Sequence, residues 1–417
     1  MSEAVNNEER NFDPYAIPMD DKFNVADGFL FEADEQWKWF ERLRNEAPVH
    51  YCSESEFGPY WSVTKFEDIM HVDKNHGIYS SEGGITIVDQ DEDFPLPMFI
   101  AMDPPTHDVQ RKTVSPVVAP MNLAKMEGLI RQRVCTILDG LPIGEEFDWV
   151  NRVSIELTTQ MLATLFDFPF EDRAKLTRWS DLATADENSG IVDSEDQRRE
   201  ELMECLTYFG RLWQERAGKP GDDLISMLAN GESTKDMLDR PAEYLGNLIL
   251  LIVGGNDTTR NSLTGGVLAL NQFPAEFDKL KANHDLINSM VPEIIRWQTP
   301  LAHMRRIALE DTILNGQKIK KGDKVVMWYI SGNRDEDAIE QPNDFIIDRE
   351  KPRHHLSFGF GIHRCMGNRL GEMQLRVAWE EILKRFDCVE VVGEPKRVIS
   401  AFVKGYTELP VILHAKK

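Results

Sequence analysis

One cysteine of this chain stands in a glycine-rich loop that suits a reactive or metal-binding sulfur. The segment 358–367 reads Phe-Gly-Phe-Gly-Ile-His-Arg-Cys-Met-Gly, and a long helical pattern follows it directly. Glycines let a backbone turn with positive φ and bring its N–H groups close to a ligand. A cysteine near a helix N-terminus is biased towards the thiolate. Cys365 is therefore a candidate nucleophile or metal ligand, although most free cysteines are small buried residues.

A nucleophilic cysteine needs a base that a third group orients. His363 is two residues away, but no cysteine-hydrolase signature surrounds it. The pattern Phe-Gly-x-Gly-x-His-x-Cys-x-Gly instead resembles the cysteine loop of the cytochrome P450 haem-thiolate enzymes. That resemblance implies that Cys365 ligates the iron of haem b, that Phe358 covers the proximal side near the sulfur, and that Gly367 lies against the cofactor.

A second motif interrupts a long apolar helix pattern over 243–270. It reads Gly254-Gly255-Asn256-Asp257-Thr258-Thr259. Each glycine inside a helix costs about 1 kcal/mol relative to alanine, so the pair must admit either a closely packed helix or a flat cofactor. The motif resembles the oxygen-binding segment of the P450 distal helix. By that resemblance Gly254 and Gly255 lie beside the haem, Thr258 hydrogen-bonds dioxygen, and Asp257 supports proton delivery.

The two haem propionates must be neutralised if they are buried. His107 and Arg111 stand at i and i+4 of an expected helix, and they resemble the family's His and Arg that reach the propionates. Arg306 and His355 align by position with two more propionate partners, and Arg305 could replace Arg306. A separate pair, Glu293 and Arg296, resembles the family's buried structural ion pair, which residues 333–335 and 345–349 complete.

The pattern of elements predicts a mainly α protein with a minor β portion. Helical patterns cover mainly 106–300 and 368–385, whereas strand-like patterns cover mainly 45–65, 305–330 and 388–413. Asn315-Gly316 indicates a hairpin, and 82–99 is expected to form an irregular loop. These features agree with a single cytochrome P450 domain over 1–417, in which haem lies between a long distal helix and the cysteine-loop helix.

Composition and charge exclude several classes of protein. A net charge of −24 in 417 residues opposes binding to nucleic acid. The five cysteines are scattered without a Cys-x-x-Cys pair, which argues against a disulfide framework, a zinc ribbon or an iron–sulfur cluster. Residues 1–24 are polar and mostly acidic, and the longest apolar run, near Leu248 to Val253, is too short to span a bilayer. We expect a cytoplasmic monomer without a membrane anchor, like the bacterial soluble members of the family.

No flavin or iron–sulfur module is recognisable in the chain, so electrons must come from elsewhere. The resemblance implies a ferredoxin and an NAD(P)H-dependent ferredoxin reductase, with O₂ as co-substrate. An acidic ferredoxin would need a locally basic face on this acidic protein. The candidates for that face are Lys112, Arg353, Arg364 and Arg369.

The segments 83–88, 94–103 and 301–306 together resemble the bacterial terminal alkane hydroxylases of this superfamily. The resemblance implies terminal (omega) hydroxylation of medium-chain n-alkanes or fatty acids to primary alcohols. An apolar pocket without a fixed charge suits such a substrate. The expected pocket walls are Ile85, Ile87, Val88, Leu96, Met98, Phe99, Leu250, Leu251, Val253, Leu301 and Phe402. Alternatives are a P450 hydroxylase of another apolar substrate such as a terpenoid or steroid, a peroxide-driven oxygenase, and a non-catalytic haem-binding protein.

Overall fold

Helices make up most of the computed structural model, which describes residues 10–416. The predicted domain, 1–417, thus includes residues 1–9 and 417, which lie outside the described residues. The helices are α1 (Gly28–Glu32), α2 (Gln36–Glu46), α3 (Phe66–Lys74), α4 (Thr106–Val114), α5 (Pro120–Asp139), α6 (Glu156–Phe166), α7 (Ala174–Thr184), α8 (Glu195–Arg216), α9 (Leu224–Asn230), α10 (Pro241–Gln272), α11 (Pro274–Ala282), α12 (Ile287–Gln298), α13 (Tyr329–Gly332) and α14 (Asn368–Arg385).

The strands are short. They are β1 (Val49–Cys52), β2 (Tyr60–Val63), β3 (Tyr79–Ser80), β4 (Glu146–Asp148), β5 (Met304–Ala308), β6 (Thr312–Leu314), β7 (Gln317–Ile319), β8 (Lys324–Met327), β9 (Phe386–Val391), β10 (Lys396–Arg397), β11 (Tyr406–Glu408) and β12 (Pro410–Ala415). The mainly α fold with a minor β portion is therefore confirmed.

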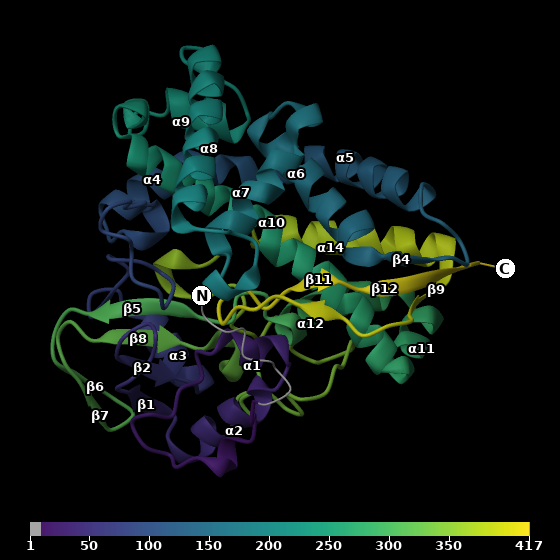
Figure 1. The fold of residues 1–417 in the computed structure, drawn as a ribbon. Coiled ribbons are helices and arrows are strands. Elements are labelled where there is room, and N and C mark those ends of the chain that lie inside the picture. Colours follow the sequence, from purple (N-terminus) through teal and green to yellow (C-terminus); the bar gives the residue numbers. More distant parts are fainter. Residues whose placement is uncertain (1–9, 417) are drawn as a thin grey trace.

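The largest sheet has the strand order β1-β2-β8-β5-β3. Its central strands β2 and β8 pair in parallel, with Ser62 opposite Val326, and every residue of both strands is buried. A strand covered on both faces reads as a continuous apolar run rather than an alternating one. Figure 1 shows this sheet with α1–α3 at the lower left and helices α4–α9 above it.

The remaining strands form smaller units. The predicted hairpin is β6–β7, whose turn residues Asn315 and Gly316 have φ values of 46° and 79°, as a type I′ turn requires. Strands β4, β12 and β9 form another sheet. The region around β4 was expected to be helical, and this expectation was wrong. Three residues pair there with β12, more than 250 positions later in the chain, and such a non-local partner leaves no local signal.

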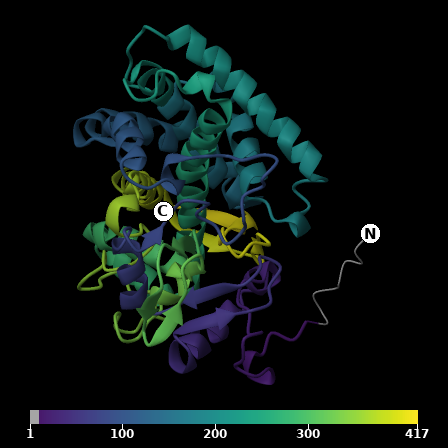
Figure 2. The same cartoon turned by 90° about the vertical axis from the view of Figure 1, so that its left-hand side faces the viewer.

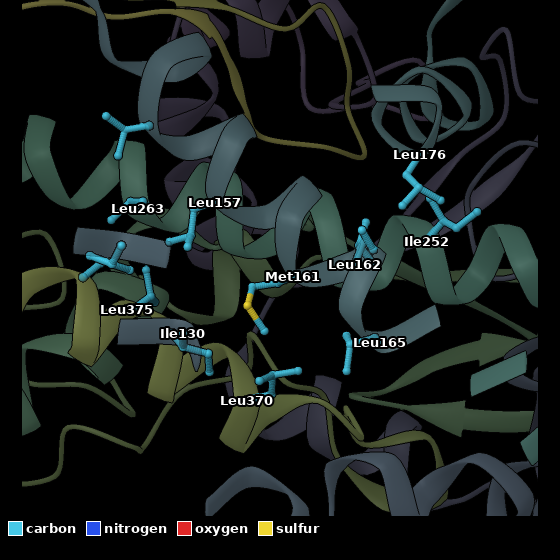
Figure 3. Close-up of a cluster of buried hydrophobic side chains, with 14 of the residues drawn as sticks. Ile130, Leu157, Met161, Leu162, Leu165, Leu176, Ile252, Leu263, Leu370 and Leu375 are labelled. Carbon is cyan, nitrogen blue, oxygen red and sulfur yellow. The ribbon is translucent and has the colours of Figure 1, made fainter. Parts of the chain in front are cut away.

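The main core surrounds α10, which contacts α6, α7, α12 and α14. Pro241 stands in its first turn, where a missing N–H costs nothing. Buried aliphatic side chains from five helices meet around it, and Figure 3 labels several of them. They are Ile130, Leu157, Met161, Leu162, Leu165, Leu176, Ile252, Leu263, Leu370 and Leu375. This packing fixes α10 relative to α14, the two helices that carry the predicted distal and proximal motifs.

Helix α8, drawn in teal along the upper edge in Figure 2, covers α7 and α9. Within residues 10–416, no helix combines the length and the apolar character that crossing a bilayer requires.

The Glu293–Arg296 ion pair lies buried in α12. Arg296 Nε is 2.7 Å from Glu293 Oε2, and Arg349 reaches the same carboxylate at 3.1 Å. Arg296 Nη1 also donates to the carbonyl oxygen of Asn333 at 2.9 Å. The predicted structural network is thus present, and it ties α12 to the chain segment that leads into the cysteine loop.

Candidate functional site

The cysteine loop lies between α13 and α14 and turns as the glycines predicted. Gly359 and Gly361 have φ values of 63° and 67°, a region that side chains avoid. The Cys365 N–H donates to the Phe358 carbonyl at 2.8 Å and closes the turn. A Cβ atom at Gly361 would lie 2.3 Å from the backbone oxygen of Asp73. Two constraints, conformation and space, therefore select glycine here.

Cys365 has exposed surface as a residue, but many protein atoms surround its thiol. It lies three positions before the first residue of α14. Burial raises the pKa of its thiol, while the N–H groups of Gly367 and Asn368 and the positive charges of Arg111 and Arg364 act in the opposite direction. These donors and cations favour a sulfur that carries negative charge once a metal displaces the proton.

Across from this loop, α10 runs without a break through the glycine pair. Gly254 is exposed in the middle of a largely buried helix, and nothing lies within 4 Å of the position that its Cβ would occupy. A Cβ at Gly255, by contrast, would lie 2.6 Å from Cδ2 of Leu162 on α6. Helix packing therefore gives Gly255 a structural reason, and its expected contact with the cofactor stays a prediction. Gly254 alone leaves open space.

Thr258 lies one turn after Gly254. Its hydroxyl donates to the Gly254 carbonyl at 3.1 Å, a bond that loosens the helical ladder at this point. Gly367, on the cysteine loop, likewise has nothing within 4 Å of its Cβ direction. The middle of α10 at Gly254 and the end of the cysteine loop at Gly367 thus both have space where a side chain would be. A flat macrocycle needs such space on its two faces.

Asp257 points away from Thr258 and towards α7. It is fully buried, Arg260 Nη2 lies 2.6 Å from its Oδ1, and the Ser180 hydroxyl donates to Oδ2 at 3.2 Å. Arg260 also binds Asp181 at 2.9 Å. Burial is the main cause that raises the pKa of Asp257 to about 6. This carboxyl group can therefore hold or release a proton near neutral pH.

Cationic and neutral nitrogen donors gather beside the cysteine loop. The rings of His107 and His363 lie 4.3 Å apart between centroids. His107 Nδ1 donates to Asp108 at 2.8 Å, but its Nε2 is buried without a partner, as are both ring nitrogens of His363. Burial, followed by the charges of Arg306, His107 and Arg111, lowers the pKa of His363 to about 2.

Buried polar nitrogens without partners are rare, because each costs about 1–3 kcal/mol. A neutral imidazole has one donor and one acceptor nitrogen, but an adjacent anion such as a haem propionate favours the protonated ring, whose nitrogens both donate. The residues present therefore fit a haem with its propionates towards His107, Arg111, Arg306 and His363. Sequence reasoning considered His363 only as a base for a nucleophile. Its position two residues before Cys365 was the signal that could have placed it at the cofactor.

His355 is not part of this cluster. Its Nδ1 accepts the N–H of Ser357 at 3.2 Å, and its ring lies 5.4 Å from that of Phe358. Burial lowers its pKa to about 3, and its nearest charges are Arg296 and Arg364. The ring contacts the entry to the cysteine loop, and its expected propionate contact stays a prediction that these contacts do not support.

Arg305 does not replace Arg306. Its guanidinium binds Asp89 at 2.6 Å and the Gly83 carbonyl at 2.6 Å. Lys324 adds bonds to Asp89 at 3.1 Å and to the Ile87 carbonyl at 3.0 Å. These contacts fasten the first half of the 82–99 loop to the main sheet, so both cations and the carboxylate serve the loop backbone.

His303, within the expected segment 301–306, binds the expected segment 83–88 and the backbone beside Phe402. Its Nε2 accepts the N–H of Ile87 at 3.0 Å, and its Nδ1 donates to the Ala401 carbonyl at 2.9 Å. Burial lowers its pKa to about 4, so the ring is neutral and the two bonds define its tautomer. Leu301 and Phe402 flank these contacts, and Leu301 also bridges to Val403.

The expected pocket walls divide into three groups. Ile87 belongs to a separate core with Phe31 and Trp328, and Phe99 belongs to the main core, so both are buried among other apolar side chains. Val88 is 52% exposed. The others are partly buried, as a residue on a cavity wall would be, and they are Ile85, Leu96, Met98, Leu250, Leu251, Val253, Leu301 and Phe402.

A thiolate loop, a glycine-marked distal helix and a cluster of propionate-type donors define a haem-binding site of the haem-thiolate class. The model of the family described as cytochrome P450 matches residues 134–404. Linalool 8-monooxygenase from Pseudomonas putida is 35% identical over 389 residues, which cover 90% of this chain and 95% of that protein. The methyl-branched lipid omega-hydroxylase from Mycobacterium tuberculosis is 31% identical over 412 residues, covering 95% and 96%.

The structure of cytochrome P450-153 from Novosphingobium aromaticivorans is similar to this one. It has a TM-score of 0.89 and 46% identity, and the match covers 95% of this chain and 100% of that chain. This chain belongs to the cytochrome P450 family. It is a monooxygenase whose cofactor is haem b, and it requires O₂ and a source of electrons.

Proposed function

We propose that this protein hydroxylates the terminal carbon of medium-chain n-alkanes or fatty acids. The reaction is R–H + O₂ + 2e⁻ + 2H⁺ → R–OH + H₂O. The haem supplies the activation of O₂, which a thiolate axial ligand favours. The chain itself must hold the cofactor, deliver protons, orient the substrate and exclude water.

Cys365 would be the iron ligand, with Phe358 against the proximal face. The charges of Arg111 and Arg306 and the donors of His107 and His363 would neutralise the propionates. The unpartnered buried nitrogens of the two histidines support this assignment, because an anion beside them would favour the protonated rings, whose nitrogens could then donate to it.

Proton delivery would use Asp257 and Thr258. Consecutive side chains leave a helix about 100° apart, and Asp257 is turned towards Ser180 and Arg260. A proton can therefore pass from Asp257 towards the Thr258 hydroxyl only when the carboxyl group leaves Arg260. The raised pKa makes this possible, because a protonated Asp257 has no ionic bond to lose.

One observation carries the substrate assignment. The charged groups that border the 82–89 segment, Arg305, Lys324 and Asp89, bind one another and the loop backbone. The acidic residues 91–93 of the same loop are exposed. The partly buried side chains of the expected pocket are apolar, namely Ile85, Leu96, Met98, Leu250, Leu251, Val253 and Leu301. Such a wall suits a hydrocarbon chain and offers no fixed charge to a polar substrate. The omega-hydroxylase among the relatives supports attack at a chain end.

For electrons we propose a ferredoxin with an NAD(P)H-dependent reductase. Arg364 and Arg369, at the cysteine loop and the start of α14, and Lys112 on α4 are exposed. Arg353 is exposed as well, although it binds Glu372 at 2.8 Å. An acidic ferredoxin could dock on this face despite the net charge of −24.

The decisive experiment is product analysis with surrogate redox partners. The substrates form a homologous series of n-alkanes, primary alcohols and fatty acids, together with linalool as a branched terpenoid. Primary alcohols from n-alkanes or ω-hydroxy acids from fatty acids would support the proposal. Turnover of the terpenoid alone would replace it with the alternative that the linalool enzyme represents, and absence of any NAD(P)H-dependent product would leave a haem-binding role.

A further inference from the structure

Asp73, in the last turn of α3, is a fully buried carboxylate that none of the roles above uses. Three donors converge on it. Arg306 Nη2 lies 2.9 Å from Oδ1, the Tyr329 hydroxyl donates to Oδ2 at 2.7 Å, and the N–H of Phe360 donates to Oδ2 at 2.9 Å. A group that meets donors alone is bound as the ionised acceptor.

These three donors come from different parts of the fold. Arg306 belongs to β5, Tyr329 to α13, and Phe360 to the cysteine loop. The loop also fits closely around this residue. A Cβ at Gly359 would lie 3.2 Å from the Tyr329 hydroxyl and 3.5 Å from Asp73 Oδ2, and Gly361 packs against the Asp73 carbonyl. Asp73 thus fixes the cysteine loop against α3, five residues before the sulfur.

The carboxylate also balances a positive charge. Arg306 is 3% exposed, its other bond goes to the Arg305 carbonyl at 2.7 Å, and its charge acts on His363. A buried cation without a counter-ion is costly, so removing one partner of a buried pair is destabilising. Without Asp73, the full charge of Arg306 would act on the propionate cluster.

We propose that Asp73 is a positioning residue that aligns Arg306 and the cysteine loop and sets the electrostatic field at the haem iron. The carboxylate of Asp73 binds Arg306, Tyr329 and the Phe360 N–H, so it would act on the cofactor through these groups. This inference rests on the proposed haem site. Its negative charge favours the ferric over the ferrous state, so the midpoint potential of the holoenzyme reports its presence.

The test is a spectroelectrochemical titration of the substrate-free holoenzyme. Asp73→Asn keeps the size and the acceptor oxygen but removes the charge. We expect its potential to rise, with a change in the reduction equilibrium of about tenfold, which is about 59 mV for one electron. Tyr329→Phe removes one donor and leaves the carboxylate less neutralised, so we expect a smaller shift of the opposite sign.

Asp335→Asn is the matched control. Asp335 is also a buried carboxylate, and it joins the start of α3, through the Phe66 N–H at 2.8 Å and Lys65 at 3.2 Å, to the segment after α13. It has no hydrogen bond to the cysteine loop or to Arg306. We expect Asp335→Asn to lower stability without the potential shift of Asp73→Asn. An equal shift in the two variants, or none in Asp73→Asn, overturns the inference.

The wild-type protein separates this inference from the haem assignment. If the reduced wild type lacks the red-shifted Soret band of a thiolate-bound carbon monoxide complex, the haem site itself is wrong. If the band is present and the potentials do not move, only the role of Asp73 fails. Should Asp73→Asn not incorporate haem, Tyr329→Phe decides alone, because an unchanged potential in that variant also contradicts the proposal.

Discussion

Two neighbouring hydroxyl groups on α10 differ in what surrounds them. Thr258 and Ser262 both donate to the carbonyl four residues earlier, at 3.1 and 2.7 Å. Only Thr258 follows the open position at Gly254.

We predict that Thr258→Ala consumes reductant and releases hydrogen peroxide instead of product, because the proton path loses its hydroxyl. The measurement compares product and peroxide formed per NAD(P)H. Ser262→Ala removes an equivalent helix bond and should stay coupled, and full coupling in Thr258→Ala would remove this residue from the relay.

The titration of Asp257 should make the coupling of the reaction depend on pH. Its pKa is raised to about 6, so the protonated fraction falls tenfold for each pH unit above that value. We expect product formed per NAD(P)H to decline as pH rises from 6 to 8. In Asp257→Asn the amide cannot titrate, so the yield should be lower and nearly independent of pH. A variant with the wild-type pH profile would assign the titration to another group.

Some helices and strands could be predicted from the sequence, and others could not. The bounds of α14 and the β6–β7 hairpin followed from local signals, a helical pattern after a glycine and an Asn-Gly turn. The partner of β4 and the place of Ile87 in a core with Trp328 depend on chain segments far apart. Motif spacing singled out Cys365 and could have singled out His363, two residues before it, but the contacts of His355 with Ser357 and of Gly255 with Leu162 depend on packing.

The segment between α12 and β5 contains Leu301, one of the expected walls of the substrate pocket. Leu301 is partly buried and bridges to Val403, beside the point where His303 joins the 82–89 and 400–403 segments. Truncating a wall leaves space that lets the chain end slide past the iron. We expect Leu301→Ala to shift hydroxylation from the terminal carbon to inner positions, as gas chromatography of the products would show. An unchanged product distribution would mean that Leu301 is not a wall. Leu309→Ala, at an exposed leucine, is the control.

At the scale of the whole molecule, buried neutral histidines make stability depend on pH. Burial lowers the pKa of His303 from 6.5 to about 4 and that of His355 to about 3. Above pH 6.5 both are neutral in the folded and unfolded states. Below it the unfolded chain binds protons first, so each histidine removes about 1.4 kcal/mol of stability per pH unit until its folded pKa is reached. Asp257, with a raised pKa, acts in the opposite direction.

Burial also lowers the pKa of His50, His107 and His363 and raises that of Asp68 and Asp73. The histidines outnumber these carboxyl groups, so we expect the free energy of unfolding of the holoprotein, measured by urea titration, to fall between pH 6.5 and 4. His303→Gln should be less stable at pH 7, because the Ile87 N–H and the Ala401 carbonyl lose well-placed partners. It should also lose stability less steeply in acid, by about 1.4 kcal/mol per pH unit. Replacing the exposed His284 by Gln serves as the control, with the wild-type slope expected. A wild-type slope in His303→Gln would show that this buried imidazole takes up its proton as readily in the folded protein as in the unfolded chain.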